Sequence, residues 1–424
     1  MRPSLWRNRD FALLWGGQTV SEIGSQVTVL ALPTLAIFTF HAGPAAVGLL
    51  VASERVPFPI LGLLAGAVVD RLRKRPLMIA CNLARLLILA TIPTLAAAGV
   101  LRLWELFVAA VAMGVFTVFF DIAYLAYVPR LVEPEQLLEA NSRLEVSYSG
   151  AFLVGPGIGG LLIQALGAAR AVLADAFSFL VSALTLLTIR SKEVSAAIPE
   201  RRHLLREVGE GLRHVFGSPV LRAQLLCMSA AGLFAHALEA PLYVFAYGRL
   251  HLTPGLLGAA LASEGIGSIA GTLVATRAIS RFGVGPIVAL ADGAAIGLSA
   301  LIPLAVFVPP LALLFPIFLV IGVLATVGNI AQVTLRQSLS PAHLQGRMTS
   351  VFRTFFWGAW PIGNLLGGAL ASAIGASTTL WLTALLGLAA NLTIILTPLW
   401  RVRSFGGGTV GLEPVVDASS AAAP

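Results

Sequence analysis

The chain has 424 residues, of which 57% belong to the apolar set and only 11% are charged. A soluble domain of this length needs about a quarter of its residues charged, so the composition excludes an ordinary water-soluble protein and predicts a chain that lies in lipid. The formal net charge of +8 would suit a nucleic-acid partner, but the basic residues gather between apolar runs, and we expect no nucleic-acid partner.

The apolar runs have the length of membrane-spanning helices. A helix that crosses roughly 30 Å of hydrocarbon needs about twenty apolar residues, and lipid tolerates only helices or closed barrels. The runs lack the alternation of barrel strands, so we predict an all-α polytopic membrane protein. Twelve spans are expected near residues 11–39, 47–69, 76–99, 104–128, 144–166, 168–189, 220–248, 254–279, 285–306, 309–335, 347–374 and 378–399.

The distribution of Lys and Arg predicts the orientation, because basic segments stay in the cytoplasm. With the N-terminus inside, the cytoplasmic segments hold 22 of the 28 basic residues, whereas the outer loops hold only Arg102, Arg170 and Arg249. This ratio predicts a multi-pass protein of the inner (plasma) membrane with both termini cytoplasmic. The first apolar run is too long for a signal peptide, so we expect it to remain as a span.

One long cytoplasmic segment, residues 190–219, divides the chain. It separates an expected six-helix bundle at 1–189 from a second at 220–400. Within this linker, Leu204, Val208 and Leu212 recur at helical spacing among charged residues, which predicts an amphipathic helix on the membrane surface. Residues 401–424 are rich in Gly, Ser and Ala, and we expect a disordered cytoplasmic tail.

The two halves resemble each other in sequence. Asp121 opens an Asp-Ile-Ala triplet near the end of span 4, and Asn329 opens Asn-Ile-Ala near the end of span 10, at an offset of 208. Two like-oriented six-helix repeats are an architecture of secondary transporters, with the substrate site between the halves at the membrane midplane.

The segment from Gly66 to Arg75 reads GAVVDRLRKR. It resembles the signature of the major facilitator superfamily between spans 2 and 3, although Arg73 stands where that family usually has a second glycine. The resemblance implies the major facilitator fold and a cytoplasmic gate, in which Asp70 faces the start of span 11. We assign to this gate Gly66, Asp70, Arg71, Arg75, Arg347 and Arg353. The alternative, a positive-inside signal, explains the arginines but not Asp70.

Span 5 contains the run Gly155 to Gly160, which reads GPGIGG. Its G-x-G-x-x-G spacing does not indicate a dinucleotide site, because no strand precedes it. The run resembles the Gly-Pro motif of exporting branches of the superfamily, and this resemblance favours export. Gly155, Gly159 and Gly160 would permit tight packing against span 8, and Pro156 would add a bend; packing alone remains the alternative.

The opening from Trp6 to Trp15 resembles the branch that includes macrolide-efflux proteins and the enterobactin exporter. Residues 121–124 and 140–142, around span 4, resemble that branch too. Drug–proton antiporters carry an arginine in span 4 that falls near Ala110 here. A coupling mechanism that depends on that arginine is therefore not implied for this chain.

Acidic residues inside spans are costly, by roughly 2.5 to 3.5 kcal/mol on insertion scales, so each should face a cavity or a partner. In the superfamily, spans 1, 4, 7 and 10 line the cavity, which singles out Glu22, Asp121 and Glu239. A carboxyl group withdrawn from water can bind and release a proton near neutral pH. We expect Glu22 first and Asp121 second to couple protons to transport, while Glu239 does the same or pairs with His236.

Further polar and aromatic residues are predicted to line the substrate cavity. Gln18, Glu22 and Gln26 share one face of span 1. The predicted lining comprises Gln18, Gln26, Arg55, Tyr124, His236, Tyr243, Asn329, Gln332 and Trp357. Core packing is the alternative for the aromatic members. Arg85, Asp175 and Asp292 are instead expected near span ends or on outer helices, snorkelling or salt-bridged.

Motifs for other chemistry are missing from the sequence. Neither lysine lies in a GxxxxGK[ST] loop, so we expect no ATP binding. No HExxH motif or Cys/His cluster suggests a metal or another cofactor. We therefore predict no enzyme but a secondary active efflux transporter of small amphipathic molecules of drug, macrolide or siderophore type, driven by proton antiport. An importer or facilitator of a polar molecule is one alternative, and a non-transporting scaffold or sensor is another.

Overall fold

The computed structural model describes Leu5 and the ranges 8–190 and 204–402. This part of the chain is helical almost throughout and contains no β-strand, which confirms the all-α prediction. The predicted tail, apart from residues 401 and 402, and most of the predicted linker before residue 204 lie outside the described residues.

The first half of the chain forms seven helices. They are α1 (Arg9–Phe40), α2 (Pro44–Arg55), α3 (Pro57–Arg71), α4 (Lys74–Ala97), α5 (Leu103–Leu131), α6 (Leu137–Leu166) and α7 (Ala168–Thr188). The predicted second span is thus broken at Val56, because Pro57 has no N–H to continue the helix. Gly167 joins α6 to α7 with a φ of 81°, a backbone conformation that favours glycine.

The second half forms eight further helices. They are α8 (Leu204–Gly217), α9 (Pro219–Ala237), α10 (Glu239–Gly248), α11 (Pro254–Phe282), α12 (Val284–Leu298), α13 (Pro310–Leu339), α14 (Ala342–Ile374) and α15 (Ala376–Leu392). The predicted seventh span is broken at Leu238, shortly before Pro241, and becomes α9 and α10. Helix α8 lies in the segment where an amphipathic helix is expected.

Eleven helical segments of the described chain are long and apolar enough to cross a membrane, against the twelve predicted. Helix α14 occupies the position of the predicted span 347–374 but is not among the eleven. Its first half carries Gln345, Arg347, Thr349 and Arg353, which lowers its apolar character. The spans are therefore placed as predicted, while the count of twelve is not confirmed as such.

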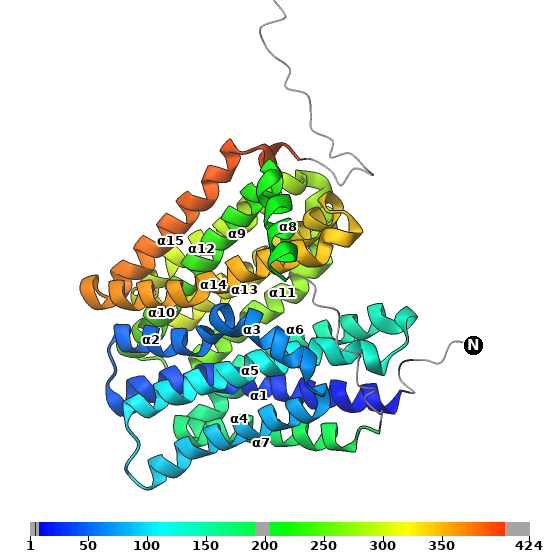
Figure 1. Cartoon of the computed structure of the whole chain (residues 1–424). Coiled ribbons are helices and arrows are strands. Elements are labelled where there is room, and N and C mark those ends of the chain that lie inside the picture. The colour runs from blue at the N-terminus through cyan, green and yellow to red at the C-terminus, as the bar shows by residue number, and fades with distance from the viewer. Residues whose placement is uncertain (1–4, 6–7, 191–203, 403–424) are drawn as a thin grey trace, which may run out of the picture.

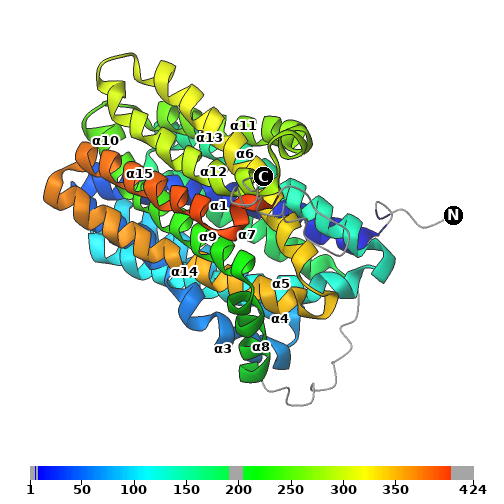
Figure 2. The same ribbon diagram turned by 90° about the horizontal axis from the view of Figure 1, so that it is seen from above.

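The helices form two groups that lie one over the other. In Figure 1, α1 to α7 make the lower layer and α9 to α15 the upper one. Figure 2 shows the upper group from above, with α9, α12, α14 and α15 across it. The groups meet along two seams, α2 against α14 and α6 against α11. This is the two-repeat architecture of the predicted fold.

Glycines bring the helix backbones together at both seams. A Cβ on Gly48 would lie 2.9 Å from the Cα of Gly368, and a Cβ on Gly160 would lie 3.1 Å from the Cα of Gly258. Real Cβ atoms essentially never approach another heavy atom within 3.0 Å, and contacts between 3.0 and 3.4 Å are uncommon. Gly155 and Gly159 instead face Gln26 and Val27 of α1. The span 5 glycines thus serve two interfaces, one within the first half and one between the halves.

Polar contacts between the halves gather at one end of the molecule. The hydroxyls of Thr34 and Tyr247 are 2.8 Å apart, the Ala45 N–H donates to Ser372 Oγ (2.9 Å), and the Gly255 N–H donates to Gln164 Oε1 (3.2 Å). All lie near the loops that join α1 to α2, α6 to α7 and α10 to α11. From this loop end, the two layers diverge toward the end where α1 begins (Figure 1).

Candidate functional site

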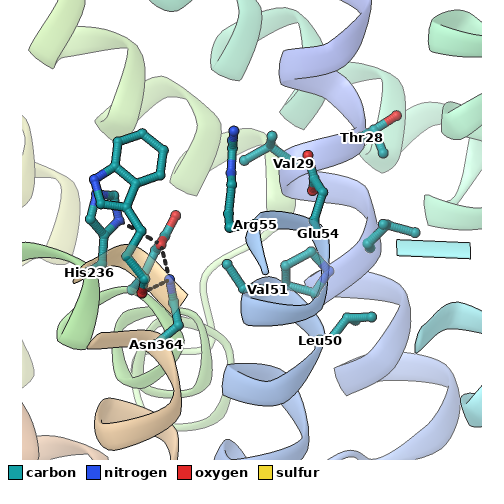
Figure 3. Close-up of a pocket in the computed structure, with 12 residues that line it drawn as sticks. Thr28, Val29, Leu50, Val51, Glu54, Arg55, His236 and Asn364 are labelled. Carbon is teal, nitrogen blue, oxygen red and sulfur yellow. Dashed lines mark hydrogen bonds and ion pairs between the residues drawn. The ribbon is translucent and has the colours of Figure 1, made fainter. Parts of the chain in front are cut away.

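A small pocket with a cavity volume of about 30 Å³ lies between the two halves (Figure 3). Helices α1 and α2 of the first half and α9, α10 and α14 of the second contribute its walls. The lining comprises Thr28, Val29, Leu32, Pro33, Leu50, Val51, Glu54, Arg55, His236, Glu239, Trp360 and Asn364. Three predicted site residues, Arg55, His236 and Glu239, therefore meet in one place.

The break between α9 and α10 builds the polar wall of this pocket. His236 lies in the last turn of α9 and Glu239 begins α10, and the imidazole Nδ1 lies 3.2 Å from Glu239 Oε2. Asn364 of α14 donates from Nδ2 to the same oxygen (3.1 Å). Glu239 thus pairs with His236, as one of its two predicted roles requires, and its carboxylate joins two helices of the second half.

The indole ring of Trp360 contacts side chains from both halves at the pocket. The rings of Trp360 and His236 have centroids 4.0 Å apart. The guanidinium carbon of Arg55, from the first half, lies 5.0 Å from the Trp360 centroid, within cation–π range. Figure 3 shows Arg55 between His236 and Glu54. Charged groups of both signs therefore face one small space.

Two buried atoms of the pocket have no hydrogen-bond partner within the described ranges. They are the Trp360 indole Nε1 and Asn364 Oδ1, and Asn364 is only 1% exposed. Leaving a buried donor or acceptor unpaired costs about 1–3 kcal/mol. A ligand that offers one acceptor and one donor would satisfy both atoms.

A second cluster of charged side chains lies inside the first half. Glu22 of α1 accepts a hydrogen bond from Gln18 Nε2 (2.8 Å), and the charges of Arg85 and Arg55 act on it. Asp121 of α5 is half-buried, and its carboxylate has no hydrogen bond or ion pair to any described residue. Tyr124, one turn further along α5, stacks on Phe120 at 6.0 Å.

Arg85 and Asp175 belong to this cluster on α4 and α7, but they are buried instead of snorkelling or salt-bridged as expected. Arg85 is 4% exposed and Asp175 is fully buried. Asp175 accepts hydrogen bonds from Thr28 Oγ1 (2.5 Å) and Ser178 Oγ (3.1 Å). One signal was available in the sequence, since Asn82 and Arg85 stand three residues apart on one face of α4.

Other predicted cavity residues lie elsewhere. Tyr243 is buried in the apolar core, Asn329 is exposed, and Gln332 donates to Asp292 Oδ2 (2.8 Å). Gln26 packs against Gly155, and the Trp357 ring lies 4.8 Å from that of Phe58. Glu54, Trp360 and Asn364 line the pocket but were not predicted. No group of three or more His, Cys, Asp or Glu that could hold a metal occurs among the described residues.

The predicted gate residues are not brought together in this conformation. Asp70 and Arg71 are exposed at the end of α3, and Gly66 is half-buried in the same helix. Arg75 donates from Nε to Leu186 O (2.7 Å) and from Nη2 to Leu187 O (2.7 Å), which ties α4 to α7.

On the other side of the predicted gate, Arg347 forms an ion pair with Glu210 of α8. The neighbouring Arg353 is exposed, with its guanidinium carbon 5.9 Å from the Trp357 centroid. Helix α8 also packs on α14 through the rings of Phe216 and Phe355, whose centroids are 6.0 Å apart. Arg347 is thus held by the linker helix.

Comparisons with known proteins agree with this architecture. A family model described as "Transmembrane secretion effector" matches residues 4–406. The chain is 31% identical over 372 residues to the multidrug efflux pump Tap of Mycolicibacterium fortuitum, covering 84% of this chain and 88% of that protein. It is 26% identical over 240 residues, 56% of each chain, to macrolide efflux protein A of Streptococcus pyogenes.

Solved structures show the same fold. The nucleoside transporter NupG superposes with a TM-score of 0.72 at 13% identity, covering 91% of this chain and 98% of that one. A bacterial homologue of the iron transporter ferroportin, in an inward-facing state, gives a TM-score of 0.70 at 15% identity, covering 92% and 99%.

Proposed function

Because the chain belongs to the transmembrane secretion effector family of the major facilitator superfamily, we propose that it is a secondary active efflux transporter that exports small amphipathic molecules by proton antiport. The family consists of transporters, so the prediction that the chain is a membrane transporter and not an enzyme is confirmed. The observation that carries the proposal is the pocket between the halves, which places Glu239, His236 and Arg55 at the junction of two helix groups.

The halves at 1–189 and 220–400 rock about this pocket. In the present conformation the seams and the polar contacts hold the loop end closed, while the layers diverge at the opposite end (Figure 1). The distribution of basic residues assigns that diverging end to the cytoplasm of a cell whose plasma membrane holds the protein, with both termini inside. The conformation is then one that loads substrate from the cytosol.

Closure of the cytoplasmic end brings Asp70 to the start of α14. Arg347 now pairs with Glu210, so closure exchanges one carboxylate partner for another. Gly66 allows close helix approach, while Arg71, Arg75 and Arg353 supply the positive charge at this end. The linker helix α8 competes for Arg347 and favours the open state.

Proton coupling is assigned to Glu22 first, then to Asp121 and Glu239. Glu22 lies on α1, where Gln18 donates to it and two arginines act on its charge. An acid that binds a proton in one conformation and releases it in the other links the proton gradient to the rocking of the halves. The substrate competes with this proton or favours the opposite conformation.

The relatives support the proposed substrate class and direction of transport. Their printed functions are multidrug and macrolide efflux, and the glycines of span 5 serve the seam that an exporter must open and close. Aromatic surface from Trp360 and Trp357, with Tyr124 beside the inner acids, suits a hydrophobic molecule that carries a few polar groups.

Reconstitution into liposomes with an imposed pH gradient tests the proposal. Wild-type protein and Glu22→Gln are compared on ethidium, erythromycin and enterobactin as probes. We expect the wild type to move at least one probe against its gradient only when the pH gradient is present, and Glu22→Gln to lose this drive. Transport without a gradient would support a facilitator instead, and equal gradient-driven transport by both proteins would remove Glu22 from the coupling mechanism.

A further inference from the structure

Arg85 is a buried cation that the transport cycle described above does not yet use. Its guanidinium carbon lies 4.3 Å from the Phe120 centroid of α5 and 4.2 Å from the Phe179 centroid of α7. Its Nη2 donates to Asn82 Oδ1, and Asn82 donates to Ser182 Oγ (2.9 Å). Two rings and an amide thus fix the guanidinium in one position.

This cation has no carboxylate directly bound to it. No ion pair of Arg85 occurs among the described residues, and its Nε has no hydrogen-bond partner there. A charge inside a membrane span that lacks a direct partner is costly. The guanidinium must therefore be balanced by charges at slightly longer range.

Acids of the first half supply that balance, two of them on helices α5 and α7 that pack against α4. The charge of Asp121 on α5 acts most strongly on Arg85, and those of Asp175 on α7 and Glu22 on α1 act on it as well; on α4 itself the titratable neighbour is Cys81. Arg55 and Arg353 also act on the charge of Asp121. Asp175 is already held by the hydroxyls of Thr28 and Ser178. Asp121 follows Phe120 in sequence, and it is the acid of the three that has no hydrogen-bond partner among the described residues.

We infer that Arg85, which packs on Phe120 of α5, is the fixed counter-ion of the adjacent Asp121, and that it is a positioning residue of proton coupling. The inference rests on the proposed antiport. Coulomb interactions over several ångströms are strong away from water, so a permanent positive charge at this point favours the ionised form of this acid. Arg85 does not line the pocket and touches no substrate. Its charge makes proton release to the cytoplasmic side possible at cellular pH.

The experiment measures protonation directly, without a substrate. The purified full-length protein is titrated between acidic and alkaline pH while the infrared C=O band of protonated carboxyl groups is recorded. Loss of an opposite charge close to a carboxyl shifts its titration by about 1–3 pH units. We expect the midpoint in Arg85→Gln to move upward by about one unit or more, and the shifted component to disappear in Arg85→Gln combined with Asp121→Asn.

A matched control comes from the second half. Arg336 lies 4.6 Å from the Phe352 centroid, and of the charged groups only Arg353 acts on it, so Arg336→Gln should leave the carboxyl titration unchanged. Arg85→Lys keeps the charge and should titrate like the wild type even if Arg85→Gln does not fold. A midpoint in Arg85→Gln equal to that of the wild type would overturn the assignment. A midpoint in Arg336→Gln that is shifted as far as that in Arg85→Gln would overturn it as well.

Transport in liposomes supplies the second readout. With ethidium as the probe, the pH of half-maximal transport in Arg85→Gln should move upward together with the infrared midpoint, whereas in a purely structural role only the amount of folded protein would fall. A wild type that transports nothing, combined with a shifted titration in Arg85→Gln, would contradict the antiport and leave the counter-ion assignment standing.

Discussion

In the first half, charged side chains lie close together among the helices. Arg85, Asp175, Asp121 and Glu22 lie on four different helices, and the charge of each acid reaches the same guanidinium. Only Asp175 has its oxygens occupied by hydroxyls. This arrangement leaves carboxyl groups that can change their protonation state.

In the second half, amides replace most of these charges. Gln224 donates to Gln332 O (2.9 Å), Cys227 donates to Asn391 Oδ1 (2.8 Å), and Gln332 donates to Asp292 Oδ2 (2.8 Å). Asn329 occupies the position in the second repeat that corresponds to Asp121 in the first. The comparison teaches that the first repeat gathers charged side chains within its own bundle, whereas the second repeat directs Glu239 and His236 to the pocket between the halves. Four substitutions test this division, from the largest expected effect to the smallest.

Closing a seam with a side chain should stop both halves from moving. Gly160→Leu would drive a side chain into the backbone of α11 near Pro254 and Gly258, and overpacking of this kind costs about 1–3 kcal/mol or more. We expect transport in liposomes to fall to background. Gly150→Leu is the control on the same helix, because its Cβ would meet open space. Equal loss in both variants would mean that the seam has no special role.

Neutralising Glu22 in the first half should matter more than neutralising Asp292 in the second. Glu22→Gln is expected to reduce gradient-driven transport by roughly 10- to 100-fold, the usual range of coupling between linked sites. Asp292→Asn keeps the acceptor for Gln332 and should retain the drive. The measurement is probe accumulation with and without a pH gradient. Loss of drive in Asp292→Asn with normal drive in Glu22→Gln would reverse the assignment of the halves.

Removing the unpartnered donor of the pocket should weaken substrate binding. Trp360→Phe keeps an aromatic ring beside His236 and Arg55 but deletes the indole N–H, and one neutral hydrogen bond is worth about 1 kcal/mol. We expect a probe to bind about 5- to 10-fold more weakly in a fluorescence titration. Trp104→Phe, on the exposed face of α5, is the control. Unchanged binding in Trp360→Phe would place the substrate elsewhere.

Releasing Arg347 from the linker helix should shift the conformation modestly. Glu210→Gln removes a partly exposed ion pair worth at most about 1 kcal/mol, so the closed cytoplasmic end should become about 2- to 5-fold more populated. Cross-linking between cysteines introduced at positions 72 and 349, in Leu72→Cys with Thr349→Cys, reports this population. Glu139→Gln, which breaks the surface pair with Arg143, should leave the yield unchanged, and an equal rise in both variants would contradict the competition.

Much of the fold could be predicted because length and hydropathy define where a chain can cross lipid. The span positions, the division near residue 200 and the repeat all follow from that constraint. The break at Leu238 was missed, since an apolar run reads the same through a bend. Yet this break sets the contact between His236 and Glu239.

The site was predicted less completely, because a helix that is apolar all round does not reveal which face a polar residue occupies. Arg85 was expected near a span end or on an outer helix, but its contacts with Phe120 and Phe179 depend on helix packing. Asn364 lies in a glycine-rich run, and no sequence pattern around it predicted its hydrogen bond to Glu239. Tyr243 was expected in the cavity, while its rotation on α10 turns it into the core.

Alternating access about the pocket is the central claim, and paired distance measurements by spin labelling test it most directly. One pair, Ala45→Cys with Ser372→Cys, reports the loop end, where these residues now share a hydrogen bond. The other pair, Leu72→Cys with Thr349→Cys, reports the diverging end. Changing pH or adding ethidium should lengthen the first distance while the second shortens. Distances that stay fixed, or that change in the same direction, would contradict the account.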